Sequence, residues 1–112
     1  MRIAIAAALF GFAACGGDDV SRAVGARCDR NVDCVDRCLG PNNEYPDGFC
    51  TLDCNDVRDC PESAECIDRE GGVCLFLCRD DRDCDFLGPN WVCRDENLRE
   101  DPSRQAGVCR GG

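Results

Sequence analysis

Cysteine spacing constrains this chain more than any other feature of its sequence. The 112 residues include 13 cysteines, and those after residue 27 fall into three groups of four. Each group opens with two cysteines that have five residues between them, with Asp just before the second, and closes on Gly-Phe-Cys or Gly-Val-Cys. A pattern of this kind indicates one small structural unit repeated three times, over residues 28–50, 54–74 and 78–109.

The loops between these cysteines differ in length from unit to unit. The third cysteine follows the second after three, five or eight residues, and the last loop of each unit holds 11, 7 or 15 residues. The segments 51–53 and 75–77 join one unit to the next. The sequence therefore predicts a common frame that carries variable loops.

The cysteines of the three units are expected to form disulfides rather than a metal site. The chain has no His, and it lacks the close Cys-x2-Cys pairs that are typical of zinc sites. Four cysteines allow three pairings per unit. We favour bonds within a unit, first to third and second to fourth, while bonds between units remain open. Six disulfides would involve Cys28, Cys34, Cys38, Cys50, Cys54, Cys60, Cys66, Cys74, Cys78, Cys84, Cys93 and Cys109.

A chain with so few large apolar residues needs cross-links to hold a fold. Disulfides at roughly 2–4 kcal/mol each can replace part of an apolar core. We expect a small disulfide-rich domain over residues 28–112, built of turns and loops with short two-stranded β ribbons and no large hydrophobic core. The Asp residues of the unit openings are expected to cap nearby backbone amides. After residue 14 the aromatic residues are Tyr45, Phe49, Phe76, Phe86 and Trp91.

The first 14 residues predict a signal peptide of the lipoprotein type. One positive charge, Arg2, precedes an unbroken run of apolar residues and Gly from Ile3 to Ala14. A helix of this length reaches about 18 Å, which is short of the roughly 30 Å hydrocarbon core of a bilayer. The run is therefore expected to direct export rather than to span a membrane. Residues 15–27 lack apolar periodicity and are expected to form a flexible tether.

The end of this run, Phe-Ala-Ala-Cys15, resembles the bacterial lipobox. The resemblance implies that the chain is cut before Cys15, that its thiol carries a diacylglyceryl group, and that this lipid holds the protein to a membrane. Lipidation of Cys15 would also leave an even number of cysteines for disulfides. The alternative is an ordinary secretory signal cut after Ala13, with Cys15 as a free thiol.

The unit pattern also resembles known cysteine-rich modules. The openings with Asp before the second cysteine and the tandem Gly-x-Cys closings look like the Dickkopf amino-terminal type. The segment CNDVRDCPESAEC (54–66) is similar to the core of whey acidic protein modules, although their adjacent Cys-Cys pair is absent. With the lipobox, the pattern resembles bacterial cysteine-rich repeat lipoproteins. This implies a location in the cell envelope, and Gly16 after Cys15 implies that the outer membrane or cell surface is favoured.

Charge and residue types exclude several classes of function. The net charge is −9, and it becomes −10 when residues 1–14, with Arg2 alone, are removed. A body this acidic repels nucleic acid. The chain has neither His nor Lys, the residues that most often serve as general base or form a Schiff base, and it has no Cys-x-x-Cys redox pair. We expect neither catalysis nor a small-molecule substrate, and no cofactor.

Acidic residues of the third unit raise the question of calcium. An EF-hand loop that begins at Asp81 would need Gly at position 86 and Glu at position 92, where the chain has Phe86 and Val92. Irregular, weak binding through Asp80, Asp81 and Asp83 stays open. Turn formation by solvated Asp beside Arg is the favoured interpretation, because Asp is common in turns for that reason.

The expected function is a non-catalytic binding or structural module with an extracellular or periplasmic protein ligand. Binding is expected on the loops 39–49 and 94–108, because loops on a rigid frame often carry function, although they suit plain solvated connections equally well. The apolar segments 75–77 and 86–92 are expected to pack between units two and three rather than to form a recognition surface. The alternative function is an extracellular protease inhibitor that presents the stapled loop 66–74 with Arg69 as bait residue.

Overall fold

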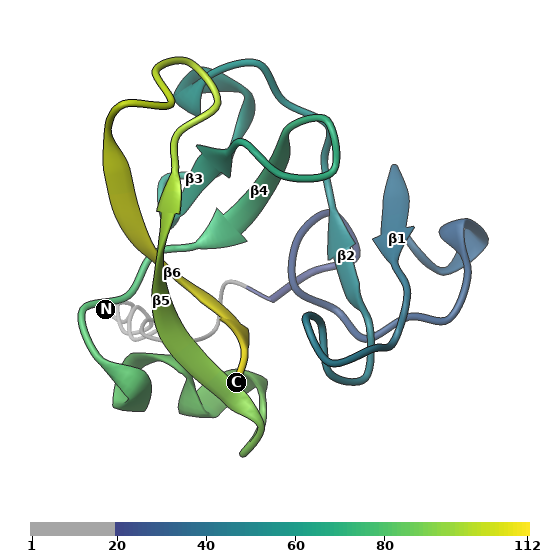
Figure 1. Ribbon diagram of the computed structural model, residues 1–112. Coiled ribbons are helices and arrows are strands. Elements are labelled where there is room, and N and C mark those ends of the chain that lie inside the picture. The colour runs from purple at the N-terminus through teal and green to yellow at the C-terminus, as the bar shows by residue number, and fades with distance from the viewer. Residues whose placement is uncertain (1–19) are drawn as a thin grey trace, which may run out of the picture.

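Three two-stranded antiparallel sheets, one in each cysteine unit, make up most of the regular structure (Figure 1). The computed structural model describes residues 20–112, so the expected signal peptide (1–14) and Cys15 lie outside the described residues. In this part of the chain no helix is long and apolar enough to cross a membrane. With η for 3-10 helices, the elements are η2 (Asn31–Asp33), β1 (Arg37–Leu39), β2 (Phe49–Thr51), η3 (Val57–Asp59), β3 (Ala64–Ile67), β4 (Val73–Phe76), η4 (Asp81–Leu87), β5 (Trp91–Asn97) and β6 (Gln105–Gly111).

The predicted fold class is confirmed by the sheets and by six disulfides. Each unit pairs its first cysteine with its third and its second with its fourth, which is the arrangement that we favoured among the open alternatives. The S–S bonds among residues 20–112 all lie within units: Cys28–Cys38, Cys34–Cys50, Cys54–Cys66, Cys60–Cys74, Cys78–Cys93 and Cys84–Cys109. In every sheet the third and fourth cysteines stand directly opposite each other, so two neighbouring bonds fasten each ribbon to its opening turn.

The opening turns form because one Asp closes each of them. The Asp33 carboxylate accepts hydrogen bonds from the amides of Asp29 (3.0 Å) and Arg30 (3.1 Å). Asp59 and Asp83 occupy the same place in units two and three and accept from the amides four and three residues earlier. The predicted capping role is confirmed. A carboxylate at this position compensates amides that a short 3-10 turn would otherwise leave without partners.

One hydrophobic core joins the three units. Phe49 of unit one packs edge-on against Phe76, with ring centroids 5.8 Å apart, and lies 5.4 Å from the ring of Trp91 in unit three. The expected packing of segments 75–77 and 86–92 between units two and three extends to unit one, because Phe49 contacts the rings of both Phe76 and Trp91. Sulfur supplies part of the interior, since five of the 18 buried residues in this cluster are half-cystines.

The second half of the expected tether is folded against unit one. Val24 is fully buried, the Gly25 amide donates to the Cys50 carbonyl (2.8 Å), and the Cys50 amide donates to the Ala26 carbonyl (2.8 Å). The prediction of a flexible segment is therefore wrong for residues 20–27. One apolar side chain and a few backbone hydrogen bonds hold this segment, and neither leaves a periodic pattern in the sequence.

Candidate binding surfaces

Four charged side chains from all three units form one partly buried cluster. Arg110 Nη2 lies 3.0 Å from Glu44 Oε2, and Arg69 Nη2 lies 2.5 Å from the same oxygen. Both arginines also pair with the carboxylate of Glu96, Arg69 at 3.2 Å. Glu44 belongs to the β1–β2 loop and Arg69 to the β3–β4 turn, while Glu96 and Arg110 lie on β5 and β6. The cluster therefore ties the loops of separate units together.

This cluster bears directly on the inhibitor hypothesis. A bait residue has to project into the pocket of a protease, whereas the Arg69 side chain is 30% exposed and its guanidinium holds two carboxylates. Burial lowers the pKa of Arg69, but the Tyr45 hydroxyl, Glu96 and Glu44 outweigh burial and raise it overall. Arg69 therefore serves as a structural cation in this fold, and its geometry does not favour a bait role.

The loop 66–74 is not closed on itself. Cys66 and Cys74 face each other across β3 and β4, but their sulfurs are bonded to Cys54 and Cys60. The segment is the tip of a β-hairpin, and Glu70 at its turn has a positive φ of 52°. Its stiffness comes from the opening turn of unit two, to which both strands are fastened.

A hollow lined by both apolar and polar residues lies beside η4. Phe76 is buried beneath it, whereas Leu77 and Phe86 keep 43% and 39% of their surface exposed. The rings of Phe76 and Phe86 are 5.4 Å apart. The hollow has a volume of about 470 Å³, and its other lining residues are Ser63, Arg79, Arg82 and Asp83. Exposed aromatic and aliphatic side chains around a depression are typical of a docking surface.

The apolar segments divide between core and surface. Leu75, Phe76, Leu87 and Trp91 are buried, as expected for packing residues. Leu77, the residue after the end of β4, is exposed and lines the hollow. Sequence alone could not separate these neighbours, because they are equally apolar and only the end of the strand and the course of η4 decide which face they take.

A second depression is polar and lies between units one and three. It has a volume of about 650 Å³ and is lined by residues of the loop 39–49, of the segment before β5 and of the C-terminus: Asn42, Asn43, Pro46, Asp47, Pro89, Asn90, Val92 and Gly112. The loop is held in place because Tyr45 is buried and Asn42 Oδ1 accepts from the amides of Glu44 and Tyr45. The loop 39–49 thus contributes to a preformed cleft.

The other expected binding loop is mostly strand. Residues 94–97 continue β5, residues 105–108 belong to β6, and the two pair in continuous antiparallel register from Trp91 to Asn97. Only residues 98–104 form the turn, and Leu98 within it is buried. The long spacing between Cys93 and Cys109 therefore extends a hairpin instead of opening a loop. Arg94 and Asp95, at the start of this segment, line a depression together with Asp81, Val92, Cys93 and Gly112.

The aspartates considered for calcium point to separate partners. Asp80 accepts a hydrogen bond from the Arg82 amide (3.0 Å), and Asp81 accepts one from the Cys93 amide (2.9 Å). Asp83 is the closing residue of the opening turn. Each carboxylate is therefore directed at a backbone amide, which agrees with turn formation as the role of these residues.

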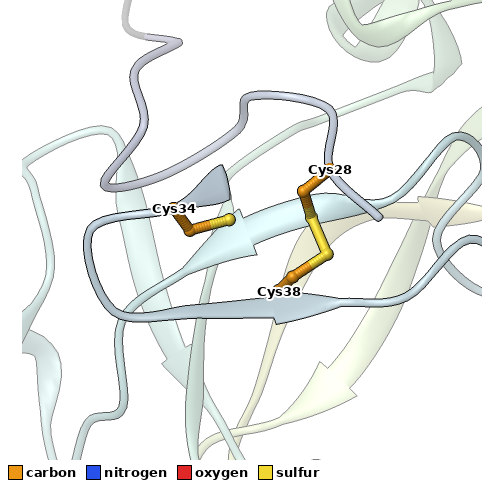
Figure 2. A group of neighbouring side chains, drawn as sticks. All are labelled: Cys28, Cys34 and Cys38. Carbon is orange, nitrogen blue, oxygen red and sulfur yellow. A yellow bond between two sulfur atoms is a disulfide. The ribbon is translucent and has the colours of Figure 1, made fainter. Parts of the chain in front are cut away.

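Sulfur atoms crowd together in each unit without offering thiolates. Cys28, Cys34 and Cys38 bring their sulfurs within 4.8 Å of one another, and Figure 2 shows the bond that joins Cys28 to Cys38 beside the Cys34 side chain. Cys34 is bonded in turn to Cys50. Units two and three contain corresponding triples. A sulfur in a disulfide has no thiolate charge with which to ligate a metal ion, so these triples are neighbouring disulfides.

No family model, curated protein or solved structure matches this chain. The resemblance to cysteine-rich repeat lipoproteins stays a prediction. The twelve cysteines predicted for disulfides are brought together in six pairs, and the remaining one, Cys15, lies outside the described residues. The charged cluster around Arg69 was not predicted, since its members are distant in the chain and only the fold brings them together.

Proposed function

We propose that this protein is an exported, lipid-anchored, non-catalytic binding module of the bacterial cell envelope. The observation that carries the proposal is the complete pairing of twelve cysteines with one another. Disulfides of this number form in oxidising compartments, so they support export. Cys15, the thirteenth cysteine, follows the apolar run 3–14, and lipidation accounts for its position.

The residues around the two depressions support a binding role over catalysis. The polar cleft carries side-chain amides and one Asp carboxylate, and the hollow beside η4 carries two guanidinium groups, one carboxylate and three apolar side chains. The chain contains no His, the most frequent general base of enzymes, and no Lys. A rigid frame with preformed depressions favours recognition, because the ordering cost is met during folding rather than during binding.

Mass spectrometry on protein purified from its native membrane tests the anchor. We expect a mature chain that begins at Cys15, carries acyl mass on that residue, and has no thiol that reacts with an alkylating reagent. A Cys15→Ser variant is the matched control and should leave the membrane fraction while keeping six disulfides. Soluble wild-type protein with an unmodified Cys15 would contradict the proposal.

Photo-cross-linking in cells tests where a partner binds. A photoreactive residue at Asn90 reports on the polar cleft, and one at Arg104 reports on the turn of the β5–β6 hairpin, with both positions exposed. We expect a discrete cross-linked species from position 90 and none from position 104. Equal cross-linking yields from both positions would show that the partner does not bind preferentially at the cleft.

A further inference from the structure

Three exposed apolar residues of the described chain lie around one buried aromatic ring. Among residues 20–112 the large apolar side chains with marked exposure are Val20, Val32, Val35, Val57, Leu77 and Phe86. Val20, Leu77 and Phe86 surround the buried ring of Phe76, and we name this group the Phe76 face. Apolar side chains grouped in this way on a surface mark a candidate site of contact with a membrane or with another protein.

The side chains of Val20, Leu77 and Phe86 all lie near the Phe76 ring. A Cβ placed on Gly25 would stand 2.6 Å from Phe76 Cε2 and 3.3 Å from Val20 Cγ2, so these two side chains are neighbours. On its other side the Phe76 ring lies 5.4 Å from the ring of Phe86. Leu77 lines the same hollow as Phe86. The start of the described chain therefore lies near the Phe76 ring.

The position of the anchor limits how far this face can be from a bilayer. Val20 is five residues after Cys15 in the sequence. Five residues span at most about 18 Å when fully extended, which is less than the width of a small domain. A lipid on Cys15 therefore keeps the Phe76 face close to the membrane surface. Because the tether raises the effective concentration of the face at the bilayer, even weak contacts with lipid are formed.

We propose that the Phe76 face rests on the headgroup region of the membrane in which Cys15 is anchored, an inference that builds on the lipid anchor proposed above. Phe86 and Leu77 enter the boundary between headgroups and acyl chains, as apolar side chains of interfacial proteins do. Arg79 and Arg82 border the hollow, and in this orientation their guanidinium groups contact lipid phosphates, that of Arg82 in exchange for its exposed ion pair with Asp80.

The charges around the hollow define the lipid that it fits. Asp80 and Asp83 lie beside the two arginines, and Asp81 and Asp85 lie on the same 3-10 helix, so the face as a whole is acidic. Such a surface is repelled by a strongly anionic bilayer. The chemistry favours a zwitterionic surface, on which the apolar contacts and the Arg–phosphate contacts act without a repulsive surface potential.

Quenching by brominated lipid tests this orientation. The chain from Cys15 onward is coupled through that thiol to a maleimide lipid in phosphatidylcholine vesicles with brominated acyl chains, so the test does not depend on natural lipidation. A Trp is introduced as Phe86→Trp, and the control is Val57→Trp on η3, where Val57 is 42% exposed. The signal of the wild-type protein, with Trp91 alone, is subtracted from both.

We expect at least twofold stronger quenching by brominated lipid for Phe86→Trp than for Val57→Trp, together with weaker quenching of Phe86→Trp by aqueous iodide on vesicles than in solution. Equal lipid quenching of the two variants, or iodide access unchanged by coupling, would overturn the proposal and leave the face to a protein partner. Failure of the natural anchor is a separate result, since it appears as unmodified Cys15 in the mass of the native protein.

Discussion

Arg110 and Glu44 are 66 residues apart in the chain, and their side chains form an ion pair with a separation of 3.0 Å. The contact connects the last strand of unit three to the loop of unit one. The units therefore contact one another directly and are not independent domains joined by linkers. The same glutamate binds Arg69 of unit two, so one carboxylate joins all three repeats.

The buried half of this cluster is expected to be sensitive to loss of a single charge. The side chains of Glu96 and Arg110 keep only 11% and 9% of their surface exposed. Glu96→Gln leaves a buried cation without its full partner, which typically costs about 3 kcal/mol. Denaturant unfolding with disulfides intact measures the loss. The control Glu62→Gln, at an exposed position, should change stability by less than about 0.5 kcal/mol, and a similar small effect at position 96 would contradict the argument.

The shared aromatic core predicts that unit one stabilises the other two. Phe49 is fully buried between Phe76 and Trp91. Phe49→Ala should destabilise the protein by about 3–5 kcal/mol and shift the fluorescence of Trp91, because the indole loses a packing partner. Phe86→Ala, which truncates a half-exposed ring, is the comparison and should have a clearly smaller effect. Unchanged Trp91 fluorescence in Phe49→Ala would show that the units do not share a core.

The features that could be predicted from the sequence are local ones. The cysteine frame repeats at short spacing, and Asp33 lies only three and four residues after the amides that it caps. Short spacings of this kind predict the turns and the ribbons, and they predict that the cysteines form disulfides. For the four cysteines of a unit, first-to-third and second-to-fourth pairing is favoured but the other pairings stay open, because spacing does not determine which sulfurs meet.

The features that could not be predicted depend on how the units lie against one another. Phe49 and Trp91 are isolated aromatic residues in sequence, and only the folded chain brings their rings within 5.4 Å. Arg69 looked suited to an exposed loop tip until the structure placed carboxylates from two other units around it. A contact between distant segments leaves no periodic signal in the sequence, so secondary-structure propensities and hydrophobic patterns do not predict it.

Disulfides that close long and short segments of the chain are expected to differ in their contribution to the free energy of unfolding. Cys84–Cys109 joins residues separated by 25 positions, and Cys28–Cys38 joins residues separated by 10. Loop-closure entropy gives about 3.5 kcal/mol for the first bond and about 2.7 kcal/mol for the second. Replacing Cys84 and Cys109 by Ala also leaves a cavity in the shared core, because both residues are buried there. Urea unfolding of the two double variants should therefore rank Cys84/Cys109 as the costlier loss, and equal midpoints would contradict this ranking.

The Asp that closes each opening turn makes stability depend on acid. Hydrogen bonds from the amides of Asp29 and Arg30 lower the pKa of Asp33 from its ordinary value of 3.8, and the amide of Arg79 does the same for Asp83. A carboxyl group with a lowered pKa in the folded state stabilises the fold above its ordinary pKa, and this contribution is lost as the pH falls through the lowered pKa. The melting temperature should therefore decrease when the pH is lowered below about 4.

A double variant, Asp33→Asn with Asp83→Asn, tests this dependence. Its melting temperature should be lower than that of the wild type near neutral pH and should change less between pH 5 and pH 2, as followed by calorimetry or circular dichroism. The control combines Asp29→Asn with Asp85→Asn, whose side chains accept no hydrogen bond from the described residues. If the control flattens the pH profile equally, general charge repulsion explains the acid sensitivity instead of the caps.

The segment before the first unit is expected to stabilise the domain, because its apolar residue belongs to the core. Val24 is fully buried, whereas Val35 is 68% exposed. Val24→Ala should lower the free energy of unfolding by about 2 kcal/mol through lost burial and the cavity left behind. Val35→Ala removes the same atoms from the surface and should change it by less than about 0.5 kcal/mol. Equal effects of the two substitutions would restore the flexible tether over residues 20–27.

Gly25 provides an independent test of the same docking. Its φ of +103° lies in the region that favours glycine, and a Cβ there would approach Phe76 Cε2 to 2.6 Å. Gly25→Ala should therefore destabilise the protein by strain and by displacement of the Phe76 ring. The substitution acts at the point where the incoming chain meets the Phe76 face, so it should also raise the protease sensitivity of residues 20–27. Gly71→Ala is the control, because Gly71 likewise has a positive φ of 86° but its Cβ would meet no atom within 4 Å. A loss of stability in Gly25→Ala no greater than in Gly71→Ala would mean that backbone strain alone is being measured and that the segment does not press on Phe76.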